Sequence, residues 1–124
     1  MQTMLIVDDD NCLRTSLATA LADTYAVHDV SSGSAAVRFL EQNRADLILL
    51  DMVMAEGDGF TVLSYAAERN PKPRVVVFSV IDQVDKAVKA MRLGAADYVL
   101  KPCDLGSLRS TLRGALRPVP SPAA

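Results

Sequence analysis

The chain has 124 residues, of which 50% are hydrophobic and 23% are charged, and its formal net charge is −2 at pH 7. This length fits one domain that can bury a core without disulfides or a structural metal. The nearly balanced charge gives no reason to expect direct nucleic-acid binding, because such domains concentrate Lys and Arg. No apolar run is long enough to span a membrane and no signal peptide is evident, so we expect a cytoplasmic protein that does not bind membranes.

Strand and helix patterns alternate along the chain. We expect strands at about residues 4–7, 25–30, 47–50, 75–78 and 97–100. Apolar residues at helical spacing predict helices at about residues 11–23, 36–43, 62–66, 84–91 and 105–116. The third strand pattern is apolar without interruption, which is typical of a strand buried on both faces of a parallel sheet. It leads directly into a carboxylate, Asp51.

This alternation predicts the α/β class: a single-domain, doubly wound (βα)5 sandwich whose five-stranded parallel sheet has right-handed crossovers and helices on both faces. Gly94 is expected to end the fourth helix. We assign residues 1–117 to this domain. The three prolines within residues 118–124 predict either a linker or a disordered tail.

Polar side chains come at the ends of four of these strands. Asp8 and Asp9 follow the first, Asp51 the third, Ser79 the fourth and Lys101 the fifth. Because ligands bind at the carboxyl edge of an open parallel sheet, we expect these side chains to converge.

The expected cluster has a definite chemistry. Three carboxylates in one place repel one another unless a cation neutralises them. A set of oxygen ligands without His or Cys favours a hard divalent ion, and Mg²⁺ fits best. With the ammonium of Lys101 and the hydroxyl of Ser79, the cluster is suited to hold a phosphoryl group on Asp51. Phosphoryl transfer needs mainly such positioning and charge neutralisation.

These residues resemble the motifs of two-component response regulator receiver domains, a family with a flavodoxin-like fold and strand order 2-1-3-4-5. The resemblance covers essentially residues 4–116. The matches in chain order are the acidic pair Asp8 and Asp9, the phosphoacceptor Asp51, the hydroxyl residue Ser79, the aromatic switch residue Tyr98 and the pair Lys101-Pro102.

The resemblance implies that Asp51 receives a phosphoryl group from a histidine kinase or a histidine phosphotransfer protein, with Mg²⁺ required. It implies that Asp9 and Asp51 bind the ion directly, that Asp8 acts mainly through water, and that the backbone carbonyl of Val53 completes the protein ligands. Such a domain is a signalling switch that assists its own phosphorylation and dephosphorylation, and not an enzyme acting on other substrates.

In the resembled family, phosphorylation draws the hydroxyl residue toward the phosphoryl group and turns the aromatic ring inward. Here these moving parts would be Ser79 and Tyr98, although an aromatic residue in a strand is also a common core residue. The change is a population shift that alters the surface of the fourth helix, fifth strand and fifth helix. Homodimers through this surface are common in the family. The cognate kinase and any C-terminal effector domain stay open.

The chain departs from the family pattern at two positions. Met54 is followed by Ala55 where proline is frequent, and Val80 stands where a small residue is frequent. Because Val80 and the apolar Val53 and Ile81 offer no group to orient an attacking water, we predict a long-lived acyl phosphate.

Two other functions remain as alternatives. One is a phosphatase or phosphotransferase that forms an aspartyl phosphate, but Val53 occupies the place where that chemistry usually needs a second acid. The other is a pseudo-receiver that only binds proteins, for which Ala55 and Val80 are slight support.

Four further residues receive structural interpretations. Asp10 is expected to lie at the surface or cap the first helix, because Asp favours that position. We expect His28 to be an exposed strand residue, and Cys12 and Cys103 to be inert thiols rather than a zinc site or a redox pair.

Overall fold

The computed structural model describes residues 1–52, 54, 59–80 and 84–117. Its elements, in chain order, are β1 (Thr3–Val7), α1 (Asn11–Leu21), β2 (Ala26–Val30), α2 (Gly33–Gln42), β3 (Leu47–Leu50), α3 (Gly59–Ala67), β4 (Arg74–Val80), α4 (Val84–Arg92), β5 (Asp97–Lys101) and α5 (Leu105–Ala115). All ten predicted elements are present. Their ends differ by a few residues, so Ser79 lies inside β4 and Lys101 is the last residue of β5.

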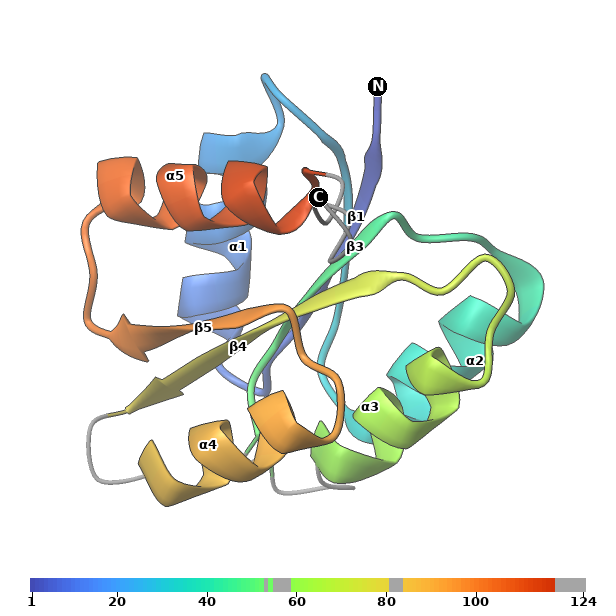
Figure 1. Ribbon diagram of the computed structural model, residues 1–124. Helices are drawn as coiled ribbons and strands as arrows, with labels where there is room; N and C mark the ends of the chain where they lie inside the picture. Colours follow the sequence, from blue (N-terminus) through green and yellow to red (C-terminus); the bar gives the residue numbers. More distant parts are fainter. Residues whose placement is uncertain (53, 55–58, 81–83, 118–124) are drawn as a thin grey trace, which may run out of the picture.

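The five strands form one sheet in the order β2-β1-β3-β4-β5, and every neighbouring pair is parallel (Figure 1). This confirms the predicted fold class and strand order. The register aligns Val7, Leu50 and Val77 across the three central strands. The residues that follow β1 and β3 therefore meet at the carboxyl edge of the sheet.

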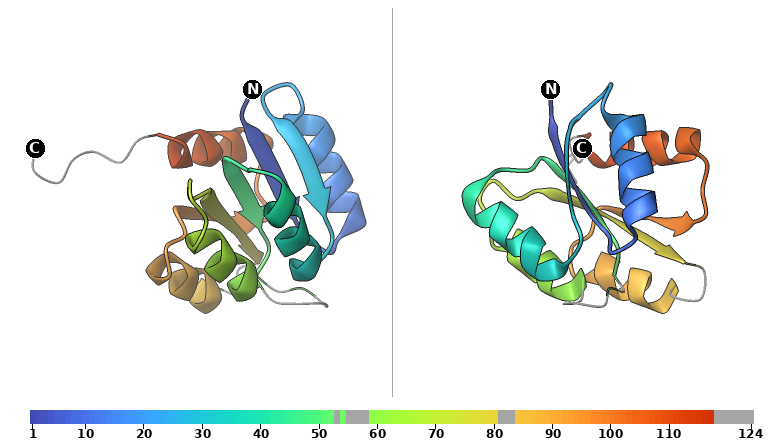
Figure 2. Two further views of the ribbon diagram at one scale, coloured as in Figure 1. Left: turned by 90° about the vertical axis from the view of Figure 1, so that its right-hand side faces the viewer. Right: turned by 180° about the vertical axis from the view of Figure 1, so that it is seen from behind.

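Helices cover both faces of the sheet (Figures 1 and 2). On one face, Ile6 and Phe78 belong to a core shared with apolar residues of α1 and α5. On the other, Leu5 and Val77 belong to a core shared with α2, α3 and α4. Successive strand residues point to opposite faces, so two separate cores hold the sheet rigid between them. Among the described residues, no helix has both the length and the apolar character needed to cross a bilayer.

Side chains at the helix ends explain several boundaries. Asp10 precedes α1 and accepts a hydrogen bond from the Leu13 N–H group, which confirms its predicted capping position. Asp104 caps α5 in the same way. Gly94 follows α4 with φ +114°, a conformation that L-residues rarely adopt, as expected of a residue that ends a helix.

Candidate functional site

Three aspartates gather at the carboxyl edge of the sheet. Asp8 and Asp9 follow β1 and Asp51 follows the adjacent β3, and one carboxylate oxygen from each lies within 4.8 Å of the others. Asp8 is 3% exposed and Asp51 9%, whereas Asp9 is exposed. The cluster is therefore walled by protein on one side and open to solvent on the side of Asp9.

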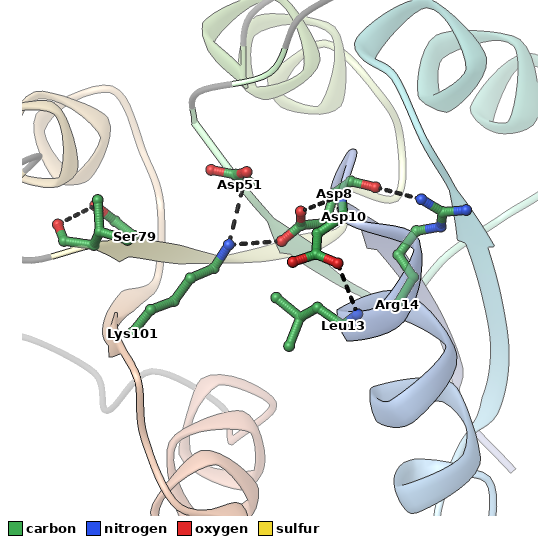
Figure 3. A network of polar contacts seen from close by, with 8 residues as sticks. Asp8, Asp10, Leu13, Arg14, Asp51, Ser79 and Lys101 are labelled. Atoms are coloured by element: carbon green, nitrogen blue, oxygen red, sulfur yellow. Dashed lines mark hydrogen bonds and ion pairs between the residues drawn. The ribbon is translucent and has the colours of Figure 1, made fainter.

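Lys101 reaches this cluster from the end of β5, two strands away from β3 (Figure 3). Its Nζ lies 2.7 Å from Asp8 Oδ2 and 3.7 Å from Asp51 Oδ2. The same ammonium lies 5.1 Å from the centre of the Phe78 ring, which helps to hold it over β4. Among the described residues, the Lys101 ammonium faces the carboxylates of Asp8, Asp9 and Asp51, a set of charges that a bound cation would stabilise.

The carboxylate of Asp8 has a protein donor on each oxygen. Oδ1 accepts a hydrogen bond of 3.0 Å from the backbone N–H of Asp10, and Oδ2 accepts one from Lys101. This arrangement suits a carboxylate that acts on a metal through water. The whole donor set is oxygen, which fits Mg²⁺ and gives no ligand typical of zinc or copper.

Ser79 and Tyr98 lie on the neighbouring strands β4 and β5. Ser79 is 3% exposed, and its Oγ donates a hydrogen bond of 3.1 Å to the carbonyl of Val80. The residue Tyr98 is 37% exposed, so it is not an ordinary core aromatic in this conformation. The structure thus places the hydroxyl inside the protein and the aromatic residue at its surface.

Two residues near the site were not singled out from the sequence. Gly59 opens α3 so close to β3 that an added Cβ would lie 2.7 Å from Met52 Cα and 2.9 Å from the Asp51 carbonyl oxygen. Any side chain there would displace the backbone that carries Asp51. Arg14 of α1 binds the backbone carbonyl of Asp8. The sequence gives only weak signals for both. Gly59 stands at the start of one apolar helix, α3, and Arg14 is a basic residue near the start of another, α1.

Some sequence predictions concern residues outside the described part of the chain. These are the Val53 carbonyl as a metal ligand, the effects of Ala55 and Ile81, and the nature of residues 118–124. Val80 is described and is 44% exposed at the end of β4.

The position of His28 is as expected, and both cysteines are described. His28 is exposed on β2, and its ring centre is 5.1 Å from that of Phe39. Cys12 and Cys103 are both free thiols. Burial raises the pKa of Cys103, and the nearby Asp104 charge adds to this, so its thiol is poorly ionised at neutral pH.

An apolar pocket of about 410 Å³ opens beside the site, between α1 and α5. We call it the α1–α5 pocket. Its lining residues are Leu13, Ser16, Leu17, Ala20, Phe78, Lys101, Pro102, Cys103, Leu105 and Leu108. Because Lys101 belongs to both, the pocket and the acidic cluster are directly adjacent.

Comparison with known proteins gives a consistent result. The family model described as "Response regulator receiver domain" matches residues 4–113. The regulatory protein AtoC of Escherichia coli K12 is 34% identical over 115 residues, covering 92% of this chain and 25% of AtoC. The photosynthetic apparatus regulatory protein RegA of Rhodobacter capsulatus is 34% identical over 126 residues, covering 98% of this chain and 66% of RegA. The chain thus spans only part of these curated relatives.

Solved structures show the same similarity. The signal receiver domain of a putative LuxO repressor protein from Vibrio parahaemolyticus has a TM-score of 0.85 at 26% identity, covering 93% of this chain and 89% of that one. The N-terminal receiver domain of a two-component response regulator from Bacteroides fragilis has a TM-score of 0.84 at 29% identity, covering 94% and 98%. The flavodoxin-like arrangement found here is therefore that of signal receiver domains.

Proposed function

Since this chain belongs to the response regulator receiver domain family, whose members are phosphorylation-based signalling switches, we propose that Asp51 is its phosphoacceptor. The observation that carries this proposal is the cluster around Asp51. Its carboxylate has two further acids within 4.8 Å and the ammonium of Lys101 at 3.7 Å. These groups supply what a transferred phosphoryl group needs, namely a nucleophile, a cation site and a fixed positive charge.

Asp9 and Asp51 would hold a Mg²⁺ ion directly, Asp8 would act through water, and the carbonyl of Val53 would be the remaining protein ligand. When bound, Mg²⁺ would neutralise charge on the oxygens of the transferring group. Asp8 has a second task, because its Oδ2 keeps the Lys101 ammonium close to Asp51. Loss of Asp8 would therefore weaken Mg²⁺ binding and leave Lys101 less well positioned beside Asp51.

The transfer itself is a displacement at phosphorus. A carboxylate oxygen of Asp51 attacks the phosphorus of a phosphohistidine, and the bond from phosphorus to the imidazole nitrogen breaks. The electron pair stays on that nitrogen, which takes a proton from solvent. The Lys101 ammonium pairs with the negative oxygens of the phosphoryl group as that group is transferred to Asp51. The chain assists this reaction on itself, and we propose no separate substrate for it.

The switch would follow from the new phosphoryl oxygens. Ser79 Oγ now bonds the Val80 carbonyl and would exchange that acceptor for a phosphoryl oxygen. Tyr98, exposed here, would turn inward as Ser79 moves. A conformation with both changes binds the phosphoryl group better, so phosphorylation shifts the population toward it. The altered surface is that of α4, β5 and α5, through which a homodimer or an effector would respond.

We further propose that the phosphodonor, a histidine kinase or a histidine phosphotransfer protein, packs over the α1–α5 pocket. The pocket is apolar and shares Lys101 with the acidic cluster, so a partner seated there would bring its phosphohistidine next to that cluster. Leu105 lines the pocket and is 39% exposed. Leu105→Glu should slow transfer from a kinase that phosphorylates the wild type, while phosphorylation by acetyl phosphate stays unchanged. Equal loss with both donors would contradict this docking surface.

Intact mass after incubation with Mg²⁺ and acetyl phosphate tests the assignment of Asp51. The wild type should gain one phosphoryl group, and Asp51→Asn should gain none. Asp10→Asn is the matched control, since Asp10 is a neighbouring acid that caps α1. A phosphoryl group that remains on Asp51→Asn, or none on the wild type, would refute the proposal.

A further inference from the structure

Arg14 lies in the first turns of α1 and binds three segments around the acidic cluster at once. Its Nη1 donates to the carbonyl of Asp8 at 2.9 Å, its Nε to Asp29 Oδ2 at 2.9 Å and its Nη2 to Asn11 Oδ1 at 2.7 Å. The side chain is only 14% exposed. Figure 3 shows it extending from α1 toward Asp8. The guanidinium thus joins the end of β1, the start of α1 and β2.

The hydrogen bond to the Asp8 carbonyl acts on the peptide unit that carries both acids. A peptide bond is planar, so the direction of the Asp8 carbonyl fixes the plane that leads to Asp9. On the other side of Asp8, its backbone N–H donates to the Val30 carbonyl at 3.2 Å. With Arg14 in place, Asp8 is held on both of its peptide groups.

We infer that Arg14 is a positioning residue for the Mg²⁺ site: it sets the Asp8–Asp9 peptide so that the Asp9 carboxylate faces Asp51. This rests on the proposed function, in which Asp9 binds the ion directly. Asp9 is exposed and its own side chain lies in a crowd of like charges, which favours conformations that spread the acids apart. Arg14 opposes that spreading through the backbone and not by contact with the ion.

The test is the Mg²⁺ affinity of the full chain, measured by titration with MgCl₂ alone. Arg14→Gln should weaken binding about tenfold, as loss of a group that orients metal ligands commonly does. The phosphorylation rate with acetyl phosphate should approach the wild-type rate once Mg²⁺ is saturating, because the reacting groups are intact. An unchanged affinity for Mg²⁺ would overturn the inference.

Two further variants separate positioning from charge and from general loosening. Arg14→Lys keeps the charge but cannot reach three acceptors in different directions, so its affinity should remain reduced, and full restoration would overturn the positioning role. Arg109→Gln is the matched control, because Arg109 binds the Ala20 carbonyl at the C-terminal end of α1 and the side chains of Asp23 and Thr24 in the turn that follows, at the opposite end of α1 from Asp8 and Asp9. An equal loss of affinity in Arg109→Gln would likewise overturn it.

Asp29→Asn keeps Arg14 and removes only the charge of its anchor, so it should fold and weaken Mg²⁺ binding by less than Arg14→Gln. If Arg14→Gln does not fold, an unchanged affinity in Asp29→Asn overturns the inference. A wild type that is phosphorylated on Asp51 while Arg14→Gln binds Mg²⁺ normally refutes the inference alone. A wild type that binds no Mg²⁺ refutes the proposed function as well.

Discussion

The helices α4 and α5 both contact β5, but they are anchored very differently. The buried residues of α5 are Leu108, Leu112 and Ala115, whereas those of α4 are Ala87 and Ala90. A buried leucine contributes about 2 kcal/mol from apolar burial and an alanine much less. Moving α4 across the sheet therefore costs far less than moving α5.

The two helices also differ at their surfaces and their ends. On α4, Val88 is 41% exposed and Met91 is 37% exposed, so part of its apolar surface faces solvent. On α5, Arg109 binds the Ala20 carbonyl at the end of α1 and Asp23 in the turn that follows. We therefore expect that, within the α4–β5–α5 surface, α4 moves on phosphorylation while the buried side of α5 stays in place.

The largest loss of stability is expected when a buried leucine of α5 is shortened. Leu112 is fully buried, and Leu112→Ala should lower the free energy of unfolding by about 3 kcal/mol through lost burial and a residual cavity. The matched change on α4, Ala90→Gly, should cost about 1 kcal/mol. Urea denaturation of both variants measures the contrast. Equal losses would mean that the two helices are anchored alike.

A smaller loss is expected where α4 ends. Gly94 has φ +114°, so Gly94→Ala forces a side chain into a conformation that L-residues avoid and should cost about 2 kcal/mol. Because the strain lies at the end of α4, amide exchange should speed up there more than in α5. Uniform acceleration in both helices would argue against a separately movable α4.

The start of α5 should be sensitive to acid. The backbone N–H and the hydroxyl of Ser107 donate to Asp104 and hold its pKa below the usual 3.8. A carboxyl whose pKa is lowered by folding stabilises the protein above its unfolded pKa, and this contribution disappears as pH falls through the folded pKa. The melting temperature of wild type should therefore exceed that of Asp104→Asn at pH 7, with the gap closing below pH 3.8. If the difference in melting temperature did not depend on pH, the Asp104 carboxylate would not be the source of this stabilisation.

The smallest effect is expected at the exposed face of α4. Met91 is 37% exposed, so Met91→Gln should change the free energy of unfolding by no more than about 0.5 kcal/mol. A larger loss in thermal denaturation would show that this face packs against something in solution.

The sequence predicted the sheet and most of the cluster because both depend on local patterns. An apolar run that ends at Asp51 predicts a strand buried on both faces of a parallel sheet. The carboxyl ends of such strands lie at one edge of the sheet and bring the acids together. The partners of the charged groups were not predictable in this way. Lys101 pairs most closely with Asp8, 93 residues away, and Arg14 on α1 reaches Asp29 on β2. Such choices depend on side-chain reach across the finished fold.

Amide hydrogen exchange of the wild type, with and without phosphorylation by acetyl phosphate and Mg²⁺, directly compares the responses of α4 and α5. We expect protection to change in α4 and β5 and to stay nearly constant along the buried side of α5. The contrast between the two helices would be wrong if phosphorylation of Asp51 left amide protection in α4 and β5 unchanged, or changed it just as much along the buried side of α5.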